Sequence, residues 1–387
     1  MIKSIVAHTE EIDDIKAAVE EIKSQLGGLD GFLRKNTLGI VSCHYEFVDS
    51  GVLDGICKAL PFEIVGTVSS GQATEAQNGE LLLTLMVLTS DTVDFVTTVT
   101  RSLTQEPGKA IEESYKTASA GREKPALILA FAPFMLENTG DEYVRVISEV
   151  SGGAPCFGTF AIDGSTDFVK CFTLAGGEHY LDKLVMVLVY GDVKPKFYIA
   201  NVSTGRIFEK SAVVTKSCGN TIMEVNERPI TEYFEDLGLT KASEEQYAFS
   251  SLPFMLDYND GAPRVSKFFI RLTPEKYAIC AGDVPEGCAL YIASADKDDV
   301  LVTTGNVVDS ILKDAGDAQA LLVYSCIGRS MTLGGDQFKE AQLIRHKISS
   351  KLPFMLGFSG GEMCPTQVLE EKAVNRFHNN AFIACLL

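Results

Sequence analysis

Hydrophobic and polar positions along the chain repeat one pattern three times. Each copy has an apolar run of strand length, a stretch with apolar positions every three to four residues, and a second apolar run led by proline. A loop and a third apolar run then follow. The first runs are Leu38–Cys43, Ala126–Phe131 and Ala320–Cys326, and the helical stretches are Ser50–Leu60, Asp141–Ser151 and Gln337–Ser350. The proline-led runs are Pro61–Gly71, Ala154–Gly164 and Leu352–Gly361, and the last runs are Leu81–Leu88, Leu184–Tyr190 and Asn380–Leu387.

A strand, an amphipathic helix and a second strand predict a right-handed crossover between two parallel strands. We expect the last run of each copy to return as a hairpin on the proline-led strand, which makes the sheets mixed. The predicted fold class is α/β, with two domains of mixed β-sheets flanked by helices. Both domains would be built from repeated strand–helix–strand–hairpin units.

The section between the second and third copies has a different pattern. Val213–Thr215 and Thr221–Val225 read as a hairpin, and Ile230–Leu237 reads as a helix stopped by Gly238. The stretch from Ser266 to Ala293 predicts a meander of short strands. We place the domain boundary before this section, which gives domains at 1–208 and 209–387.

Net charge and composition limit the binding partners and the cellular compartment that we expect for this chain. The 387 residues carry 34 basic and 52 acidic side chains, a net charge of −18, which argues against nucleic acid and anionic membranes as partners. No apolar run approaches the roughly 20 residues of a membrane span, and no secretory signal opens the chain. The ten cysteines contain no C-x-x-C pair. We therefore expect a soluble, cytoplasmic protein with reduced thiols.

Motifs for cofactors and metals are absent from the sequence. It contains neither G-x-G-x-x-G after a strand nor G-x-x-x-x-G-K nor H-E-x-x-H. Its five histidines lack metal-ligand spacing, and Asp257–Gly261 reads as a turn. We predict no cofactor, no metal and no assigned catalytic residue.

Small polar residues end each proline-led strand. They include Ser69 and Ser70 in the first copy, Asp163 in the second, and Gly360 and Gly361 in the third. Ligands of α/β proteins bind beyond the carboxyl ends of strands, where glycine lets them approach the backbone. These residues are candidate ligand contacts, and tight turns without a ligand are the alternative.

The third copy adds titratable groups to its strand end. Glu362 leaves one strand, and His378, Asn379 and Asn380 enter an antiparallel one, so a hairpin would bring a carboxylate near an imidazole and two amides. Such a cluster can orient an ammonium, a carboxylate or an amide. The alternative is that His378 and Asn379 only cap the loop.

Cys326 ends the first strand of the same copy, and Arg329 follows it closely. A thiol beside a guanidinium can be a nucleophile with a low pKa. The alternative is a buried strand cysteine, with Arg329 paired to an acidic neighbour.

These residues carry a resemblance to a known family. Tyr324-Ser-Cys-Ile-Gly-Arg329, Gly357-Phe-Ser-Gly-Gly-Glu362 and Phe377-His-Asn-Asn380 resemble the C-terminal half of FIST-domain proteins. Ile64–Gly71, Phe157–Gly164 and Val214–Asn226 are similar to the N-terminal half and the linking stretch. One departure is the Ser359-Gly360 pair, where the family often has an aromatic before Gly-Glu. We expect this departure to open the pocket near Glu362.

The resemblance implies an intracellular sensory module of bacterial signal transduction that binds a small molecule, with amino acids or their derivatives as the expected ligands. We expect a stand-alone form without an output domain, which would signal through a separate protein. Arg329 would hold a ligand carboxylate, Glu362 would accept from an amine, and Asn379 and the glycine backbones would fix the remainder. The oligomeric state is left open.

Two other functions stay open at this point. The first is an enzyme acting on an amide or thioester, with Cys326 as nucleophile, His378 as base and Glu362 as orienting group. The second is an interaction scaffold whose acidic surface binds a basic partner.

Overall fold

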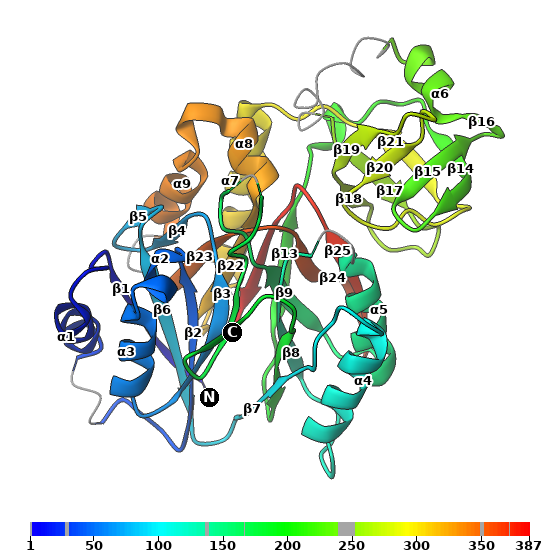
Figure 1. Cartoon of the computed structure of the whole chain (residues 1–387). Coiled ribbons are helices and arrows are strands. Elements are labelled where there is room, and N and C mark those ends of the chain that lie inside the picture. The colour runs from blue at the N-terminus through cyan, green and yellow to red at the C-terminus, as the bar shows by residue number, and fades with distance from the viewer. Residues whose placement is uncertain are drawn as a thin grey trace.

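The computed structural model describes residues 2–27, 31–135, 139–165, 167–238, 252–348, 352–370 and 372–387. Within these ranges, three six-stranded sheets form a main body and an eight-stranded sheet forms a separate, smaller lobe (Figure 1). We name the three sheets I, II and III after the copy that supplies their central strands. The prediction of mixed sheets flanked by helices is confirmed.

Each copy of the pattern forms the core of one sheet. Sheet I holds β1 (Lys3–Thr9), β2 (Asn36–Cys43), β3 (Glu63–Val68) and β6 (Leu83–Ser90), with α1 (Ile15–Gln25), α2 (Glu46–Asp49) and α3 (Val52–Ala59). Sheet II holds β7 (Asp94–Val99), β8 (Leu127–Ala132), β9 (Cys156–Phe160) and β12 (Val185–Tyr190), with α4 (Pro107–Ala118) and α5 (Gly140–Val150). Sheet III holds β13 (Lys196–Ala200), β22 (Leu321–Cys326), β23 (Phe354–Ser359) and β26 (Phe382–Leu386), with α7 (Lys297–Asp314), α8 (Ile327–Leu333) and α9 (Lys339–Ile348). Residues 349 and 350, which the predicted third helical stretch included, lie outside the described residues. The described residues also contain two 3₁₀ turns. The turn η1 (Thr204–Arg206) lies between β13 and the smaller lobe, and η3 (Gly334–Asp336) directly follows α8.

The first strand and the proline-led strand of each copy pair in parallel, as β2–β3, β8–β9 and β22–β23. The predicted hairpin of the last strand on the proline-led strand is wrong. The last strand instead pairs antiparallel with the first strand, as β6–β2, β12–β8 and β26–β22. The reason is that another element already occupies the free edge of each proline-led strand.

That element is a hairpin from a different copy. The hairpins are β4 (Gln72–Thr74) with β5 (Asn78–Gly79), β10 (Thr173–Ala175) with β11 (Glu178–Tyr180), and β24 (Glu362–Leu369) with β25 (Lys372–His378). They join β23, β3 and β9 respectively. The hairpin of the first copy thus joins the third copy, that of the second joins the first and that of the third joins the second, which closes a cycle. The predicted halves 1–208 and 209–387 therefore share sheets II and III.

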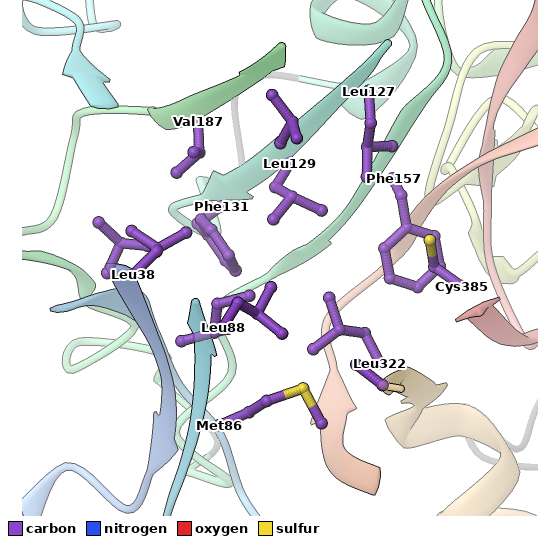
Figure 2. Packing of buried hydrophobic residues seen from close by; sticks show 14 of the residues in the cluster. Leu38, Met86, Leu88, Leu127, Leu129, Phe131, Phe157, Val187, Leu322 and Cys385 are labelled. Carbon is purple, nitrogen blue, oxygen red and sulfur yellow. The ribbon is translucent and has the colours of Figure 1, made fainter. Parts of the chain in front are cut away.

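One apolar core lies between the three sheets. It takes Leu38, Met86 and Leu88 from the first copy, Leu129, Phe131, Phe157 and Val187 from the second, and Leu322 and Cys385 from the third (Figure 2). The opposite face of each sheet packs on its own helices. The strand ends above the shared core are thus positioned by all three sheets.

Residues 207–238 and 252–293 form the smaller lobe, which we call the small domain. It contains β14 (Ala212–Cys218), β15 (Thr221–Val225), β16 (Arg228–Pro229), α6 (Ile230–Asp236), β17 (Phe254–Asp257), β18 (Val265–Lys267), β19 (Phe269–Leu272), β20 (Ala278–Cys280) and β21 (Ala289–Ile292). The predicted hairpin at 213–225 and the helix after Pro229 are confirmed. The predicted meander is only partly present, because β20 pairs with β19 and β15 whereas β21 pairs with β14 and β17.

Candidate functional site

The ends of the three proline-led strands meet above the shared core. The Ile162 N–H donates to the Val68 carbonyl at 3.2 Å, and the Phe160 N–H donates to the Gly361 carbonyl at 2.9 Å. The cycle closes where the Phe358 N–H donates to the Gly71 carbonyl at 2.9 Å. The three strand-end loops that the sequence singled out are therefore direct neighbours.

A serine-centred turn places Glu362 at this junction. Ser359 Oγ donates to the Gly361 carbonyl at 2.5 Å, accepts from the Gly361 N–H at 3.1 Å, and accepts from Thr159 Oγ1 at 2.8 Å. The chain reverses direction sharply here, so Glu362 begins β24 opposite Thr159 of the neighbouring copy. A side-chain hydroxyl that bonds to nearby backbone is a common way to fix such a turn.

Glu362 is fully buried and lacks a hydrogen-bond partner of normal geometry on either carboxylate oxygen. No ion pair involves it among the described residues. Burial raises the pKa of this carboxyl well above its usual range, and the nearby Ser359 hydroxyl, Cys326 thiol and Ala381 N–H offset only part of that effect. A buried carboxyl left in this state costs free energy, so the position calls for a further partner.

Other unpartnered acceptors lie at the same junction. His378 lies directly opposite Glu362, so the predicted proximity is present, but it arises in the β24–β25 hairpin and not between the proline-led and last strands; Asn379 and Asn380 follow His378. All three are buried, and Asn379 Oδ1, Asn380 Oδ1 and His378 Nδ1 have no partner in the described structure. The Nε2 atom of His378 lies 3.2 Å from the Cys364 carbonyl. We call Cys326, Ser359, Glu362, Asn379 and Asn380 the Glu362 cluster.

Cys326 faces Glu362 as a neutral thiol. Burial and the charge of Glu362 raise its thiol pKa well above the usual value, although the N–H groups of Gly328 and Asn380 act in the opposite direction. A nucleophilic cysteine needs the reverse environment, one that lowers the pKa.

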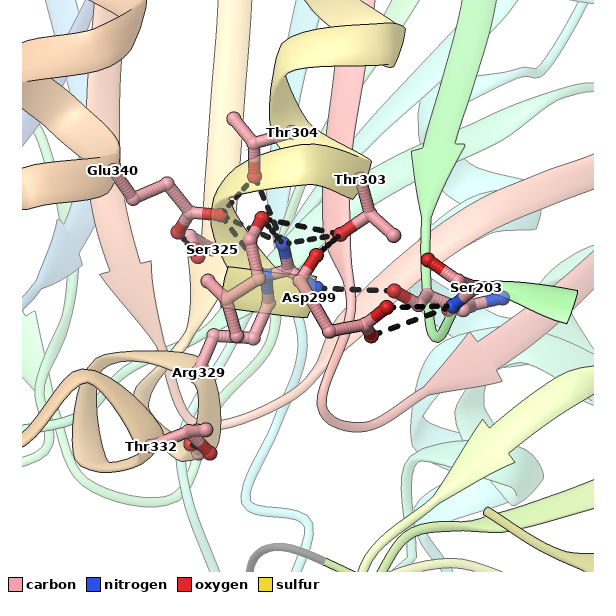
Figure 3. Close-up of polar contacts among 11 residues, drawn as sticks. Ser203, Asp299, Thr303, Thr304, Ser325, Arg329, Thr332 and Glu340 are labelled. Atoms are coloured by element: carbon pink, nitrogen blue, oxygen red, sulfur yellow. Dashed lines mark hydrogen bonds and ion pairs between the residues drawn. The ribbon is translucent and has the colours of Figure 1, made fainter. Parts of the chain in front are cut away.

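Arg329 does not present a free guanidinium to this cluster. Its Nη2 lies 2.8 Å from Glu340 Oε1 in a buried ion pair, and its Nε donates to the same oxygen at 3.0 Å (Figure 3). The remaining donors reach Thr304 Oγ1 at 2.8 Å and the carbonyls of Val300 at 3.0 Å and Asn201 at 3.3 Å. Arg329 therefore pairs with an acidic neighbour, which is the alternative stated in the sequence analysis. Its bonds connect α8 to α7 and α9.

The candidate ligand contacts of the first and second copies bond mainly to the backbone of the strand-end loops. Ser69 Oγ donates to the carbonyls of Gly71 and Phe358, both at 2.8 Å, so it joins the first copy to the third. Asp163 accepts from the N–H groups of Ser165 at 2.9 Å and Lys170 at 2.8 Å, which shapes its own loop. The hydroxyl of Ser70 is buried without a partner.

The space beside Gly360 is filled by an aromatic ring. A Cβ at Gly360 would lie 3.0 Å from Phe134 and 3.1 Å from the Ala161 carbonyl. The expected opening of the pocket at this position is therefore wrong, because Phe134 of the second copy takes the room of the missing side chain.

Sequence reasoning missed Thr159 and Gln72 as parts of this junction, and it named Ser359 only as part of a departure from the family pattern. Gln72 resembles Glu362, since each begins an exchanged hairpin directly after a turn in which a serine hydroxyl donates to a glycine carbonyl, Ser69 to Gly71 and Ser359 to Gly361. The oxygen of the Gln72 amide is also buried without a partner. A comparison of the three copies for residues that directly follow the strand-end glycines would have found it.

Two negative findings apply to the described ranges. They contain no group of three or more His, Cys, Asp or Glu side chains able to hold a metal ion. None of their helices combines the length and apolar character that crossing a membrane demands.

The fold and the junction thus define an α/β protein with a buried, acceptor-rich cluster between three repeated units. Family models for the FIST N domain and the FIST C domain match residues 37–228 and 230–365. The chain belongs to the FIST family, whose domains are sensory domains of signal transduction. No curated protein matches the chain in sequence. A crystal structure of a cyanuric acid hydrolase from A. caulinodans is similar over 100% of this chain and 99% of that one, with 10% identity and a TM-score of 0.39.

Proposed function

We propose that this FIST protein is a cytoplasmic sensory protein that binds a small ligand with a primary ammonium group at the Glu362 cluster. Amino acids and their amine derivatives are the ligand class. The observation that carries the proposal is the fully buried carboxyl of Glu362, which has no ion pair and no hydrogen bond of normal geometry among the described residues, although Ser359, Cys326 and the Ala381 N–H lie near it.

The chemistry of the unpartnered atoms selects the ligand. Four of them are oxygens that accept hydrogen bonds, namely both carboxylate oxygens of Glu362 and the Oδ1 atoms of Asn379 and Asn380. An ammonium group supplies three donors and a positive charge. It would satisfy several of these acceptors at once and would let Glu362 ionise despite its burial.

A signal can leave the cluster through the small domain. The N–H of Asn379 donates to the Ser266 carbonyl of the small domain at 3.0 Å. Gly328, next to the cluster on α8, lies close to Phe268 of the same domain, since a Cβ there would be 3.6 Å from its ring. A ligand that shifts Asn379 or Asn380 would therefore change how the small domain rests on the body, and a separate signalling protein would sense the change.

Catalysis at Cys326 ranks below ligand binding. The thiol is held neutral, and His378, the expected base, has its pKa lowered to about 3 by burial while its Nε2 faces the Cys364 carbonyl. An activated thiol needs a base within hydrogen-bond reach, and this geometry does not favour one.

The test is a thermal-shift screen of free amino acids and their decarboxylated amines at millimolar concentration. We expect at least one ammonium-bearing compound to raise the melting temperature by a few degrees, and Glu362→Gln to abolish the shift because it removes the charge but keeps the shape. Glu20→Gln, on the exposed face of α1, is the matched control and should keep the shift. Absence of any stabilising amine, or equal shifts in Glu362→Gln and the wild type, would contradict the proposal.

A further inference from the structure

A groove lies between α5, the edge strand β25 and the small domain. Its volume is about 730 Å³, and β25 and α5 lie beside the small domain in Figure 1. The strand β25 contributes Ala373, Val374, Asn375, Arg376 and Phe377, α5 contributes Asp141, Glu142, Val144, Arg145, Ser148 and Glu149, and the small domain contributes Tyr258, Asp260, Asp283 and Pro285. None of the residues of the Glu362 cluster lines it, and it runs along β25 from Phe377, next to His378, away from the cluster.

The floor of the groove is the edge of a sheet. β25 is the last strand of sheet II, and five consecutive residues of it line the groove. Successive side chains of a strand point to opposite faces, so an unbroken run of lining residues means that the groove follows the strand edge.

The two ends of this edge are already bonded. The Ala373 N–H donates to the Gly153 carbonyl at 2.9 Å, and the Phe377 carbonyl accepts from Lys267 Nζ at 2.9 Å. Because donors alternate along an edge, the outward N–H groups between these ends are those of Asn375 and Phe377. Neither has a partner in the described structure outside the β24–β25 ladder. Such an edge is a template for another strand.

The walls of the groove are acidic. Asp141, Glu142, Glu149, Asp260 and Asp283 face two guanidinium groups, those of Arg145 and Arg376. Lys267 neutralises Asp141 at 2.7 Å, Arg376 pairs with Asp260, and Arg145 pairs with Glu149 at 3.0 Å. Glu142 and Asp283 are left to set a negative potential over the edge.

Two polar atoms in the groove also await a partner. The hydroxyl of Tyr258 and the Nε–H of Arg376 are buried and unpartnered among the described residues. The guanidinium of Arg376 stacks on the Tyr258 ring at 4.5 Å, so one wall presents both atoms as a unit. Both can donate to a carbonyl oxygen.

We propose that the groove binds an extended, basic segment of a partner protein by strand addition to β25. The backbone of the segment would bond to the free N–H groups of Asn375 and Phe377, and its carbonyls would accept from Tyr258 and Arg376. Side chains of an added strand alternate between the α5 wall and the small-domain wall, so two consecutive lysine or arginine residues would place one positive charge against the carboxylates of each wall. This inference concerns an interaction surface and does not depend on what binds at the Glu362 cluster.

The probe is a fluorescein-labelled peptide of about ten residues in which pairs of lysines alternate with pairs of threonines, so that lysine side chains face both walls and threonine favours the extended conformation. Fluorescence polarisation measures its affinity for the full chain, and a peptide with glutamate in place of lysine is the charge control. We expect binding of the lysine peptide only, with an affinity that falls as salt rises.

Charge reversal on both walls locates the site. Glu142→Lys with Asp283→Lys should weaken the lysine peptide at least about tenfold, whereas Glu20→Lys with Glu123→Lys, which changes the net charge equally at exposed positions, should not. Thermal melting confirms that each variant is folded. Equal weakening by both pairs, or none by either, would overturn the proposal.

Amide hydrogen exchange separates strand addition from general attraction. Bound peptide should slow exchange at Asn375 and Phe377 in the wild-type chain. Absence of binding at millimolar peptide, or binding that leaves these amides unprotected, would show that the β25 edge is not the docking site.

Discussion

Glu362 and His378 lie opposite each other in one hairpin, yet burial acts on them in opposite directions. It raises the pKa of the acid and lowers the pKa of the base, so each tends to its neutral form. The pair is therefore not an ion pair in the unliganded protein. A cationic ligand would change the charge of Glu362 alone, since His378 gains nothing from a positive neighbour.

The pH dependence of stability follows from these shifts. Burial lowers the pKa of His378 from 6.5 to about 3, so its neutral form contributes stability above pH 6.5 that is lost as the pH falls towards 3. At ~1.4 kcal/mol per pKa unit, the upper bound is on the order of 4–5 kcal/mol. Glu362 acts with the opposite sign, because its raised pKa contributes stability below about pH 4.5 that is lost as the pH rises.

Substitution of His378 shows how much of the pH dependence of stability comes from this residue. We expect His378→Gln to reduce the loss of unfolding free energy between pH 7 and pH 4, as measured by urea denaturation, relative to the wild type. His179→Gln, on the short hairpin strand β11, is the control and should keep the wild-type slope. Parallel pH profiles for His378→Gln and the wild type would mean that His378 does not titrate between these states.

At the scale of elements, Arg329 holds three helices together. Its bonds to Glu340 on α9 and to Thr304 and Val300 on α7 start from α8, directly after the strand that carries Cys326. Removal of one partner of a buried ion pair leaves the other charge uncompensated.

We expect Arg329→Met to lower the free energy of unfolding by about 3–5 kcal/mol, and Arg329→Met with Glu340→Met to recover much of that loss. Urea denaturation of both single variants and the double variant forms the required cycle. Recovery of the free energy of unfolding in the double variant would support a structural role for the ion pair between Arg329 and Glu340. If the double variant were no more stable than Arg329→Met, the ion pair would not be the reason for the loss.

The sequence predicts the local units well and their pairing less well. Strand, helix and proline-led strand could be found because periodicity and proline act within each unit. The Glu362–His378 proximity could be found because a hairpin is local. The partner of Arg329 could not be found, since Glu340 becomes a neighbour only when α9 packs on α7 and α8. Neither could Phe134 at Gly360, because it comes from another copy.

At the scale of the molecule, the exchanged hairpins explain why the sequence-based halves do not separate. The hairpin β4–β5 from the first half completes sheet III, and β24–β25 from the second half completes sheet II. Within sheets I and II, two glycines let the backbones of the parallel strands pack closely. A Cβ at Gly66 or Gly158 would lie only 1.8 or 1.9 Å from the carbonyl of the parallel neighbour. Periodicity alone does not reveal which edge a hairpin joins, since every edge of the three sheets accepts the same backbone bonds.

We expect the fragment 1–208 expressed alone to lack a stable fold, because β9 would lose its partner β24 and the β4–β5 hairpin would lose β23. Co-expression with 209–387 should restore a complex with the circular dichroism and cooperative melting of the intact chain. A monomeric fragment 1–208 with a cooperative melt like that of the whole protein would show that the halves are independent domains.

The central claim is that the unpartnered carboxyl of Glu362 receives a cationic ligand, and proton release tests it most directly. Isothermal titration of the most stabilising amine, in two buffers of different ionisation enthalpy near neutral pH, counts the protons that leave on binding. Glu362 is held towards its protonated form by burial and would ionise against an ammonium, so we predict release of up to about one proton in the wild type and none in Glu362→Gln. Binding with no proton release, or identical release from both proteins, would contradict the account.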